Sequence, residues 1–211
     1  MRGRKAPTAQ SFQKYAVDSG LSEVIYSPLY DYQSYALAGT TTSYTFFQVP
    51  VGQSGKTLED TNMESAGQLP AGKNFIIEGI QVVMFPGVAA SVQGAQAVSA
   101  FLNDLYTLGK AGYLKLFIGS KDYLIDGPIG KFTQQFGVAG FSSVADVTTA
   151  GAALQHRDAM GAWRGQYYAI TPVTLKQNTN FSVSLNFPTT TAISANLRIG
   201  VILDGHLARR A

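Results

Sequence analysis

The chain has 211 residues, of which 14% are Asp, Glu, Lys or Arg, 45% are hydrophobic and none is cysteine. This composition excludes a disulfide-stapled scaffold and thiolate metal sites. It also excludes a heavily charged free surface, because an ordinary soluble domain is about 25% charged. We therefore expect a subunit that covers much of its surface with neighbouring chains; a secreted or surface-exposed β protein is the alternative.

Both ends of the chain are basic although the net charge is only +3. Arg2, Arg4 and Lys5 open the sequence, and Arg209 and Arg210 close it. Such clusters suit contact with nucleic acid or anionic lipid headgroups, and a solvated tail is the alternative. The sequence has no apolar run of the ~20 residues that a membrane span needs, and its first residues lack the apolar core of a secretory signal. We expect no classical export.

The first elements are an arm, a short strand and a tyrosine-rich stretch. Residues 1–20 mix basic, small and polar side chains, which predicts a basic N-terminal arm outside the core. Residues 21–26 predict a short strand that ends at Ser27-Pro28. The next stretch has a density of tyrosine that favours a subunit interface, with a half-buried loop as the alternative; its tyrosines are Tyr30, Tyr32, Tyr35 and Tyr44.

The strongest strand signal lies at residues 69–85. A strand at 43–49 and a loop at 50–67 precede it, and Leu69-Pro70-Ala71-Gly72 predicts a turn at its start. From Phe75 onwards, alternate positions are apolar on both sides, so we expect a central strand that is buried on both faces and packs against a second layer. One face is Phe75, Ile77, Gly79, Gln81, Val83 and Phe85, and the other is Ile76, Glu78, Ile80, Val82 and Met84.

One helix is predicted, over about residues 97–108, because its apolar residues recur at helical spacing and glycines follow. Residues 113–118 and 123–125 then predict a hairpin around the turn at 119–122. The Gly- and Ala-rich excursion at 137–166 has little periodicity. It is too apolar for a free linker, so we expect ordered chain with short helical pieces.

The last third of the chain predicts three more strands. Residues 167–175 and 180–187 flank a turn-forming tetrad at 176–179. The final strand, at 197–203, precedes Asp204-Gly205, the strongest short turn signal in the chain. Residues 206–210 then either pair back as a short strand or run off as a tail.

These elements predict an all-β fold with about eight strands and one helix. Repeated strand-helix alternation is missing, which disfavours a doubly wound α/β sheet. Long connections at 86–112 and 127–166 favour Greek-key wiring over a plain meander. We expect one domain over residues 21–211, a jelly roll of two four-stranded antiparallel sheets packed face to face.

The sequence contains few residue patterns that are typical of catalytic or metal sites. Residues 50–57, PVGQSGKT, nearly match a phosphate-binding loop, but Pro50 replaces the first glycine and no apolar helix stripe follows Thr57. A strand-connecting loop is therefore favoured over an ATPase or GTPase. The only histidines are His156 and His206, and the sequence shows no pattern of further ligands that would complete a zinc site with them. We predict no catalytic residue, no metal site and no cofactor.

The segments SYTFFQV, NFIIEGIQVVMF, YLKLFIG with KDYLIDG, YYAITPVTL with NFSVSLNF, and NLRIGVILDG span about residues 40–207. In architecture they resemble the jelly-roll capsid proteins of icosahedral bacteriophages and other viruses. The resemblance implies a self-assembling structural subunit without catalysis or a small-molecule substrate, made in the host cytoplasm and located in the virion. Its partners would be copies of itself in trimers, pentamers or hexamers, and other virion proteins.

The resemblance also implies roles for particular residues. Arg2, Arg4 and Lys5, with Arg209 and Arg210, would face the genome or an internal membrane. Subunits would meet through the tyrosine-rich stretch and through the 137–166 excursion with Trp163 and its neighbour Tyr167. The second hypothesis is a β-sandwich lectin or a receptor-binding phage tail or spike protein, in which Trp163 and Tyr167 stack on sugar rings.

Overall fold

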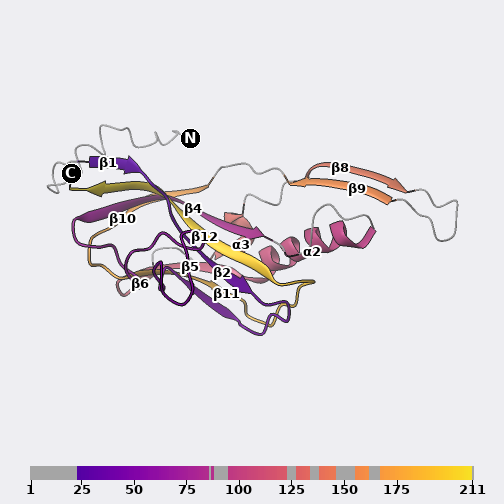
Figure 1. Ribbon diagram of the computed structural model, residues 1–211, viewed down its shortest axis with the longest axis horizontal. Helices are drawn as coiled ribbons and strands as arrows, with labels where there is room; N and C mark the ends of the chain where they lie inside the picture. Colours follow the sequence, from indigo (N-terminus) through magenta and orange to yellow (C-terminus); the bar gives the residue numbers. More distant parts are fainter. Residues whose placement is uncertain are drawn as a thin grey trace.

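The computed structural model describes residues 23–85, 87, 95–122, 127–133, 138–145, 155–161 and 167–210. The described chain is mostly β structure, and its main body consists of two antiparallel sheets (Figure 1). The prediction of an antiparallel β protein is confirmed at that level. The arm predicted at residues 1–20 lies outside the described residues.

The first sheet contains five strands in four positions. Its strands are β1 (Glu23–Tyr26), β2 (Leu29–Tyr35), β12 (Leu197–Arg209), β4 (Lys73–Phe85) and β10 (Tyr168–Leu175). β1 and β2 lie end to end along one edge of β12, separated by Ser27-Pro28. β4 pairs along the other edge of β12, and β10 pairs with β4. The tyrosine-rich stretch is therefore a strand over 29–35.

The second sheet also contains five strands in four positions. Its strands are β3 (Ser43–Phe46), β11 (Phe181–Asn186), β5 (Tyr113–Ile118), β6 (Lys121–Asp122) and β7 (Gly127–Pro128). β6 and β7 pair with opposite ends of β5. The chain turns back onto β5 earlier than predicted, because β6 lies within the predicted turn at 119–122; the predicted return strand at 123–125 lies outside the described residues. β10 and β11 lie in different sheets, so the turn at 176–179 crosses between the sheets. The two strands do not pair with each other.

One core joins the inner faces of the two sheets. It includes Phe46 and Val183 from the second sheet and Ile77 and Ile199 from the first, all fully buried. Packing the inner faces of the two sheets against each other stabilises the fold, because it removes apolar surface from water.

The central strand β4 is confirmed, but its predicted alternation breaks at Glu78. Phe75 and Ile77 face the shared core, and so do Ile80 and the alternate residues after it. Opposite β12, Asp204 pairs with Gly79 and Gly205 with Ile77, so Glu78 is the extra residue of a β-bulge. A bulge shifts the phase of the side chains by one position. The core therefore includes the first residues of one predicted face, Phe75 and Ile77, and the later residues of the other, Ile80, Val82 and Met84.

The predicted turn at Asp204-Gly205 is wrong, because β12 runs through both residues to Arg209. The bulge on β4 lies opposite this dipeptide. A Cβ on Gly205 would lie 1.8 Å from the backbone oxygen of Ile76, so the glycine is required by close backbone approach instead of by a turn. Residues 206–209 continue the same strand.

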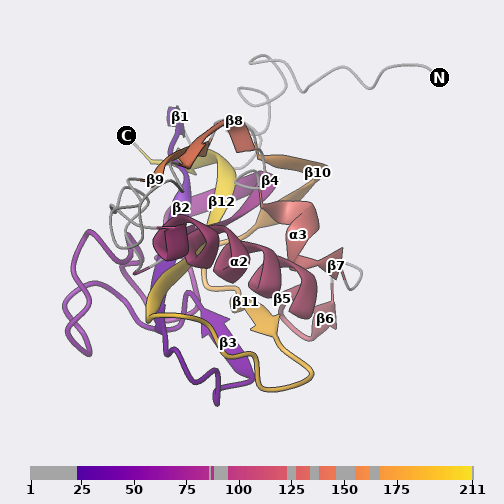
Figure 2. The same ribbon diagram turned by 90° about the vertical axis from the view of Figure 1, so that its right-hand side faces the viewer.

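The predicted helix is confirmed as α2 (Ala95–Ala111), followed by Gly112. Leu105 and Leu108 belong to the shared core, and Figure 2 shows α2 crossing in front of strands of both sheets at one end of the molecule. A second, short helix, α3 (Ile129–Phe132), buries Ile129 and Phe132 beside it.

The excursion at 137–166 differs from the prediction of helical pieces. Its described parts are two strands, β8 (Val138–Ala145) and β9 (Gln155–Gly161), which pair with each other in a separate antiparallel sheet. The ladder has an irregularity between Val138 and Phe141. An irregular ladder breaks the period of two, which is the signal that identifies a strand in sequence.

Candidate subunit interface and basic end

Tyr32 lies on the outer face of the first sheet. It pairs directly with Gly200 of β12, and a Cβ on Gly200 would lie 2.1 Å from the Tyr32 ring. The ring therefore rests on the glycine. On its other side, the guanidinium carbon of Arg198 lies 4.4 Å from the ring centroid, and Arg198 Nη2 donates to Asp60 Oδ1 at 3.1 Å. These contacts order the ring on the surface.

Tyr30 and Phe85 extend this surface on either side of Tyr32. The centroid of Tyr32 is 6.1 Å from that of Tyr30 and 5.9 Å from that of Phe85. The Tyr30 hydroxyl donates to the backbone oxygen of Leu58, and the side chains of Phe85 and Leu58 are 38% and 67% exposed. We call Tyr30, Tyr32 and Phe85 the aromatic row. Ordered aromatic rings at a surface are typical of protein interfaces.

The Tyr167 ring packs against a second glycine, Gly79, at the bulge of β4. A Cβ on Gly79 would lie 1.9 Å from the Tyr167 ring, which is nevertheless 36% exposed. Nearby, Glu78 Oε2 lies 2.9 Å from His206 Nδ1. The bulge is what brings Glu78 and Gly79 to the same outer face, because both lie between the core residues Ile77 and Ile80.

Tyr26 completes the group around the bulge. Its hydroxyl donates to Asp204 Oδ1 at 2.6 Å, and its ring meets that of His206 edge-on at 5.7 Å. The hydrogen bond to Asp204, followed by burial, raises the pKa of Tyr26 to about 12, so the hydroxyl stays protonated at neutral pH. We call Tyr26, Glu78, Tyr167, Asp204 and His206 the bulge cluster.

Tyr35 and Tyr44 are a correction, because both rings lie in the core of the chain itself. Their exposed fractions are 0% and 6%, and the two rings stack at 5.3 Å. The Tyr35 hydroxyl donates to the backbone oxygen of Thr191 at 2.6 Å, and burial raises the pKa of Tyr35 to about 12. Neither residue can reach a neighbouring subunit in this fold. Trp163, the other predicted interface ring, lies outside the described residues.

The basic residues at the C-terminus lie where the chain enters the first sheet. Because β1 is antiparallel to β12, Glu23 pairs with Arg209, whose Nε donates to Glu23 Oε2 at 2.6 Å. The first described residue, Glu23, therefore lies beside Arg209. Arg2, Arg4 and Lys5 themselves lie outside the described residues.

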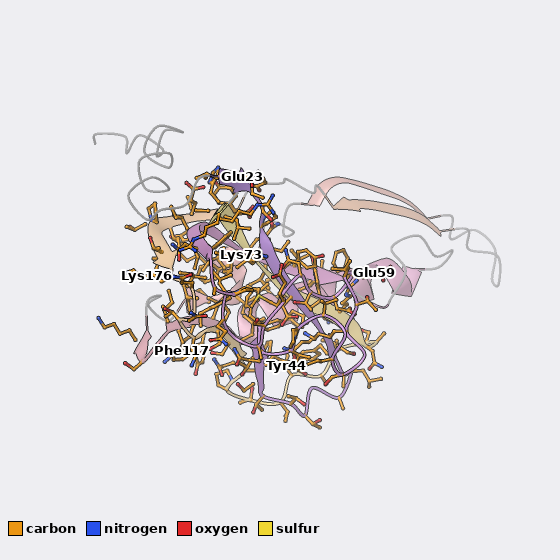
Figure 3. The ribbon with its side chains drawn as sticks, turned by 60° about the vertical axis from the view of Figure 1, so that its left-hand side comes forward. Glu23, Tyr44, Glu59, Lys73, Phe117 and Lys176 are labelled. Atoms are coloured by element: carbon orange, nitrogen blue, oxygen red, sulfur yellow. The ribbon has the colours of Figure 1, made fainter. Side chains whose placement is uncertain are left out.

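Two further lysines at this end were not singled out from sequence. Lys73 begins β4, pairs with Arg209 across the ladder and forms an ion pair with Glu64. Lys176 lies in the turn between β10 and β11, and Figure 3 shows it on the same side of the molecule as Lys73 and Glu23. Four cations, Lys73, Lys176, Arg209 and Arg210, thus share this end of the molecule.

 Lys176 precedes Arg209 by 33 positions in the sequence, and Lys73 precedes it by 136. Strand pairing, and not proximity in sequence, brings Lys73 and Lys176 to the same end as Arg209 and Arg210.

The segment that resembles a phosphate-binding loop is anchored to the first sheet. Lys56 Nζ forms an ion pair with Asp31 Oδ1, and the amide of Phe47 donates to Asp31 Oδ2 at 2.6 Å. Burial raises the pKa of the Asp31 carboxyl, and the hydrogen bonds from Lys56 and Phe47 act in the opposite direction. Residues 50–67 contain no helix. Since Lys56 is occupied by Asp31, the loop lacks the free lysine and the following helix that phosphate binding uses.

Metal ligands do not gather in the part of the chain that the structure describes. Within it, no group of three or more His, Cys, Asp or Glu side chains could hold a metal ion. In the same part of the chain, no helix is both long enough and apolar enough to cross a membrane.

No family model matches the chain, and no curated protein matches it.

Proposed function

We propose that the chain is a structural subunit of an icosahedral virus shell, of the bacteriophage type, and that it assembles with copies of itself in the virion. The observation that carries this proposal is the pairing of its strands. The two sheets contain eight strand positions along the chain: β1 with β2, β3, β4, β5, β6 with β7, β10, β11 and β12.

The order of these positions supports a jelly roll. The first position pairs with the eighth, the second with the seventh, the third with the sixth and the fourth with the fifth. This is the pattern of one long antiparallel ribbon that is rolled up, so that the sheets have the orders 1-8-3-6 and 2-7-4-5. Jelly rolls of eight strands build virus shells and lectins.

The surface favours a shell over a solitary lectin. Only 14% of the residues are charged, and the outer face of the first sheet presents two groups of ordered rings, the aromatic row and the bulge cluster. The cations gather at the end of the molecule where the chain enters the first sheet. A subunit that makes several weak contacts of this kind gains stability when the shell closes, because each contact raises the effective concentration for the next.

The experiment is assembly of the purified chain, followed by light scattering after size exclusion and by negative-stain microscopy. We expect closed shells. Phe85→Ala removes an exposed ring of the aromatic row and should reduce assembly, whereas Tyr106→Ala, which removes a 61% exposed ring from α2, is the matched control. A chain that stays solitary at every salt concentration would contradict the proposal.

The second candidate is a glycan-binding module, and the bulge cluster is the observation that favours it. Tyr26 and Tyr167 are 60% and 36% exposed beside the carboxylates of Asp204 and Glu78. Rings next to carboxylates can stack on sugar rings and accept hydrogen bonds from hydroxyl groups. A discrete small oligomer that binds glycans, and loses that binding in Tyr167→Ala, would support this function instead.

A further inference from the structure

A hollow of about 800 Å³ opens at the basic end of the molecule. Its lining includes Glu23, Lys73, Gln177, Asn178, Arg209 and Arg210. These residues come from the start of β1, the start of β4, the turn after β10 and the end of β12. The volume is in the range of pockets that bind small ligands, and the lining includes three cationic side chains, one carboxylate and two side-chain amides.

The wall formed by the turn at 176–179 is held rigidly. Gln177 Oε1 accepts a hydrogen bond from the Gly72 amide at 2.5 Å, and the Gln177 amide donates to Asn74 Oδ1 at 2.8 Å. The Asn178 amide donates to the backbone oxygen of Leu69 at 3.0 Å. Because Gln177 Oε1 is the acceptor, its Nε2 remains as a donor. The donors are therefore positioned before any ligand arrives.

The cations of the hollow are only partly neutralised. Arg209 Nε donates to Glu23, which leaves its two terminal nitrogens as donors, and Lys73 is paired with Glu64. Among the residues that the structure describes, the side chain of Arg210 has no acidic partner. One positive charge of the lining is therefore available for a ligand.

We propose that this hollow binds phosphate groups of a nucleic-acid strand, with Arg210 supplying the free charge and Arg209, Gln177 and Asn178 supplying hydrogen-bond donors. The inference rests on the proposed function and adds to it a phosphate site in the folded domain, separate from the N-terminal arm. Cations and amide donors that contact phosphates bind without reading sequence.

A nucleic-acid strand fits the hollow better than a lipid surface. Peripheral membrane binding combines cations with large apolar side chains that enter the headgroup layer. The lining of the hollow contains Ala71 and Gly72 but no large apolar side chain. A concave, polar site also suits a narrow chain of phosphates more than a flat layer of headgroups.

The test is fluorescence anisotropy of a labelled single-stranded oligothymidine with the dilute, full-length chain over a series of salt concentrations. The variant is R209Q with R210Q, which removes two cations of the lining. The control is K110Q with K115Q, which removes the same charge from α2 and β5. We expect the variant to lose roughly tenfold in affinity, and its salt slope to fall by about 1.4, because each contact with a single strand contributes about 0.7. The control should change less than about twofold.

Three outcomes would overturn the inference: unchanged binding in the variant, equal losses in the variant and the control, or a loss confined to vesicles that contain anionic lipid. Circular dichroism melting of both variants checks that folding is intact. Negative-stain microscopy separates this inference from the proposed function. Shells that form from the variant while oligonucleotide binding is lost would support both, whereas absence of shells from every chain would contradict only the proposed function.

Discussion

Asp31 is buried on the inner side of β2 with its charge matched by a single side chain. Its exposed fraction is 0%, and Lys56 is its only cationic partner among the described residues. A buried carboxylate that loses its partner is expensive, because the remaining charge has neither water nor a counter-ion. The lysine that makes residues 50–57 resemble a nucleotide-binding loop is thus a structural residue in this fold.

This pair predicts a pH-dependent cost for Lys56→Met. Burial already raises the Asp31 pKa above 3.8, so the folded state holds its proton more tightly than the unfolded state. Stability from this group is therefore full below the unfolded pKa and falls as the pH rises through the folded pKa. Without Lys56 the folded pKa rises further. We expect a loss of about 3 kcal/mol at pH 7 and a much smaller loss near pH 4, measured by urea unfolding followed by circular dichroism.

The control for that experiment is the double variant D31N with K56M, which removes the titrating group. Its stability relative to the natural chain should show no comparable fall between about pH 4 and pH 7. An equal loss at both pH values in Lys56→Met alone would contradict the explanation, because the cost would then be lost packing and not an unmatched charge.

At the scale of elements, β4 and β12 depend on one bulge and one glycine. Gly205→Ala would place a Cβ 1.8 Å from a backbone oxygen, which cannot move without breaking the ladder. We expect a loss of more than about 2 kcal/mol in the free energy of unfolding. Gly52→Ala is the control, since its φ is +83° but no atom lies within 4 Å of the new Cβ, and it should cost about 1 kcal/mol. Equal costs for the two variants would contradict the close-approach argument.

Helix α2 is joined to the segment before β12 by Asp104. Its Oδ1 accepts hydrogen bonds at 2.9 Å from both the amide and the hydroxyl of Ser194, while its Oδ2 has no hydrogen-bond partner in the described part of the chain. Asp104→Ala leaves the Ser194 amide without its acceptor and should cost about 1–3 kcal/mol. Asp104→Asn keeps an acceptor without a buried charge and should cost less, as thermal unfolding would show. A larger cost for the asparagine would contradict this role.

At the scale of the whole molecule, the first described strand and the last strand meet at the basic end. Glu23, the first described residue, pairs with Arg209 there. Deleting residues 1–5 should leave the thermal midpoint unchanged and weaken association with nucleic acid or lipid, because three cations are lost without loss of core. Unfolding of the truncated chain would contradict the arm interpretation.

Local pattern was sufficient for the existence and type of most elements. The apolar spacing at 97–108 predicted α2, and the apolar run at 69–85 predicted a central strand, because helices and buried strands impose their period on neighbouring residues. The scarcity of charge likewise needed no structure to be noticed.

Tertiary contacts decided the rest. The neighbouring strand determines whether Tyr32 or Tyr35 faces the core and where the side-chain phase of β4 shifts. An alternation of apolar and polar residues does not indicate which of the two faces of a strand is buried. Asp204-Gly205 has the composition of a turn, but β4 pairs alongside it and keeps the strand extended. The hollow at the basic end forms because antiparallel pairing brings Glu23, Lys73 and Arg209 together at one end of the first sheet. These residues are far apart in the sequence, so no single stretch of it could reveal the hollow.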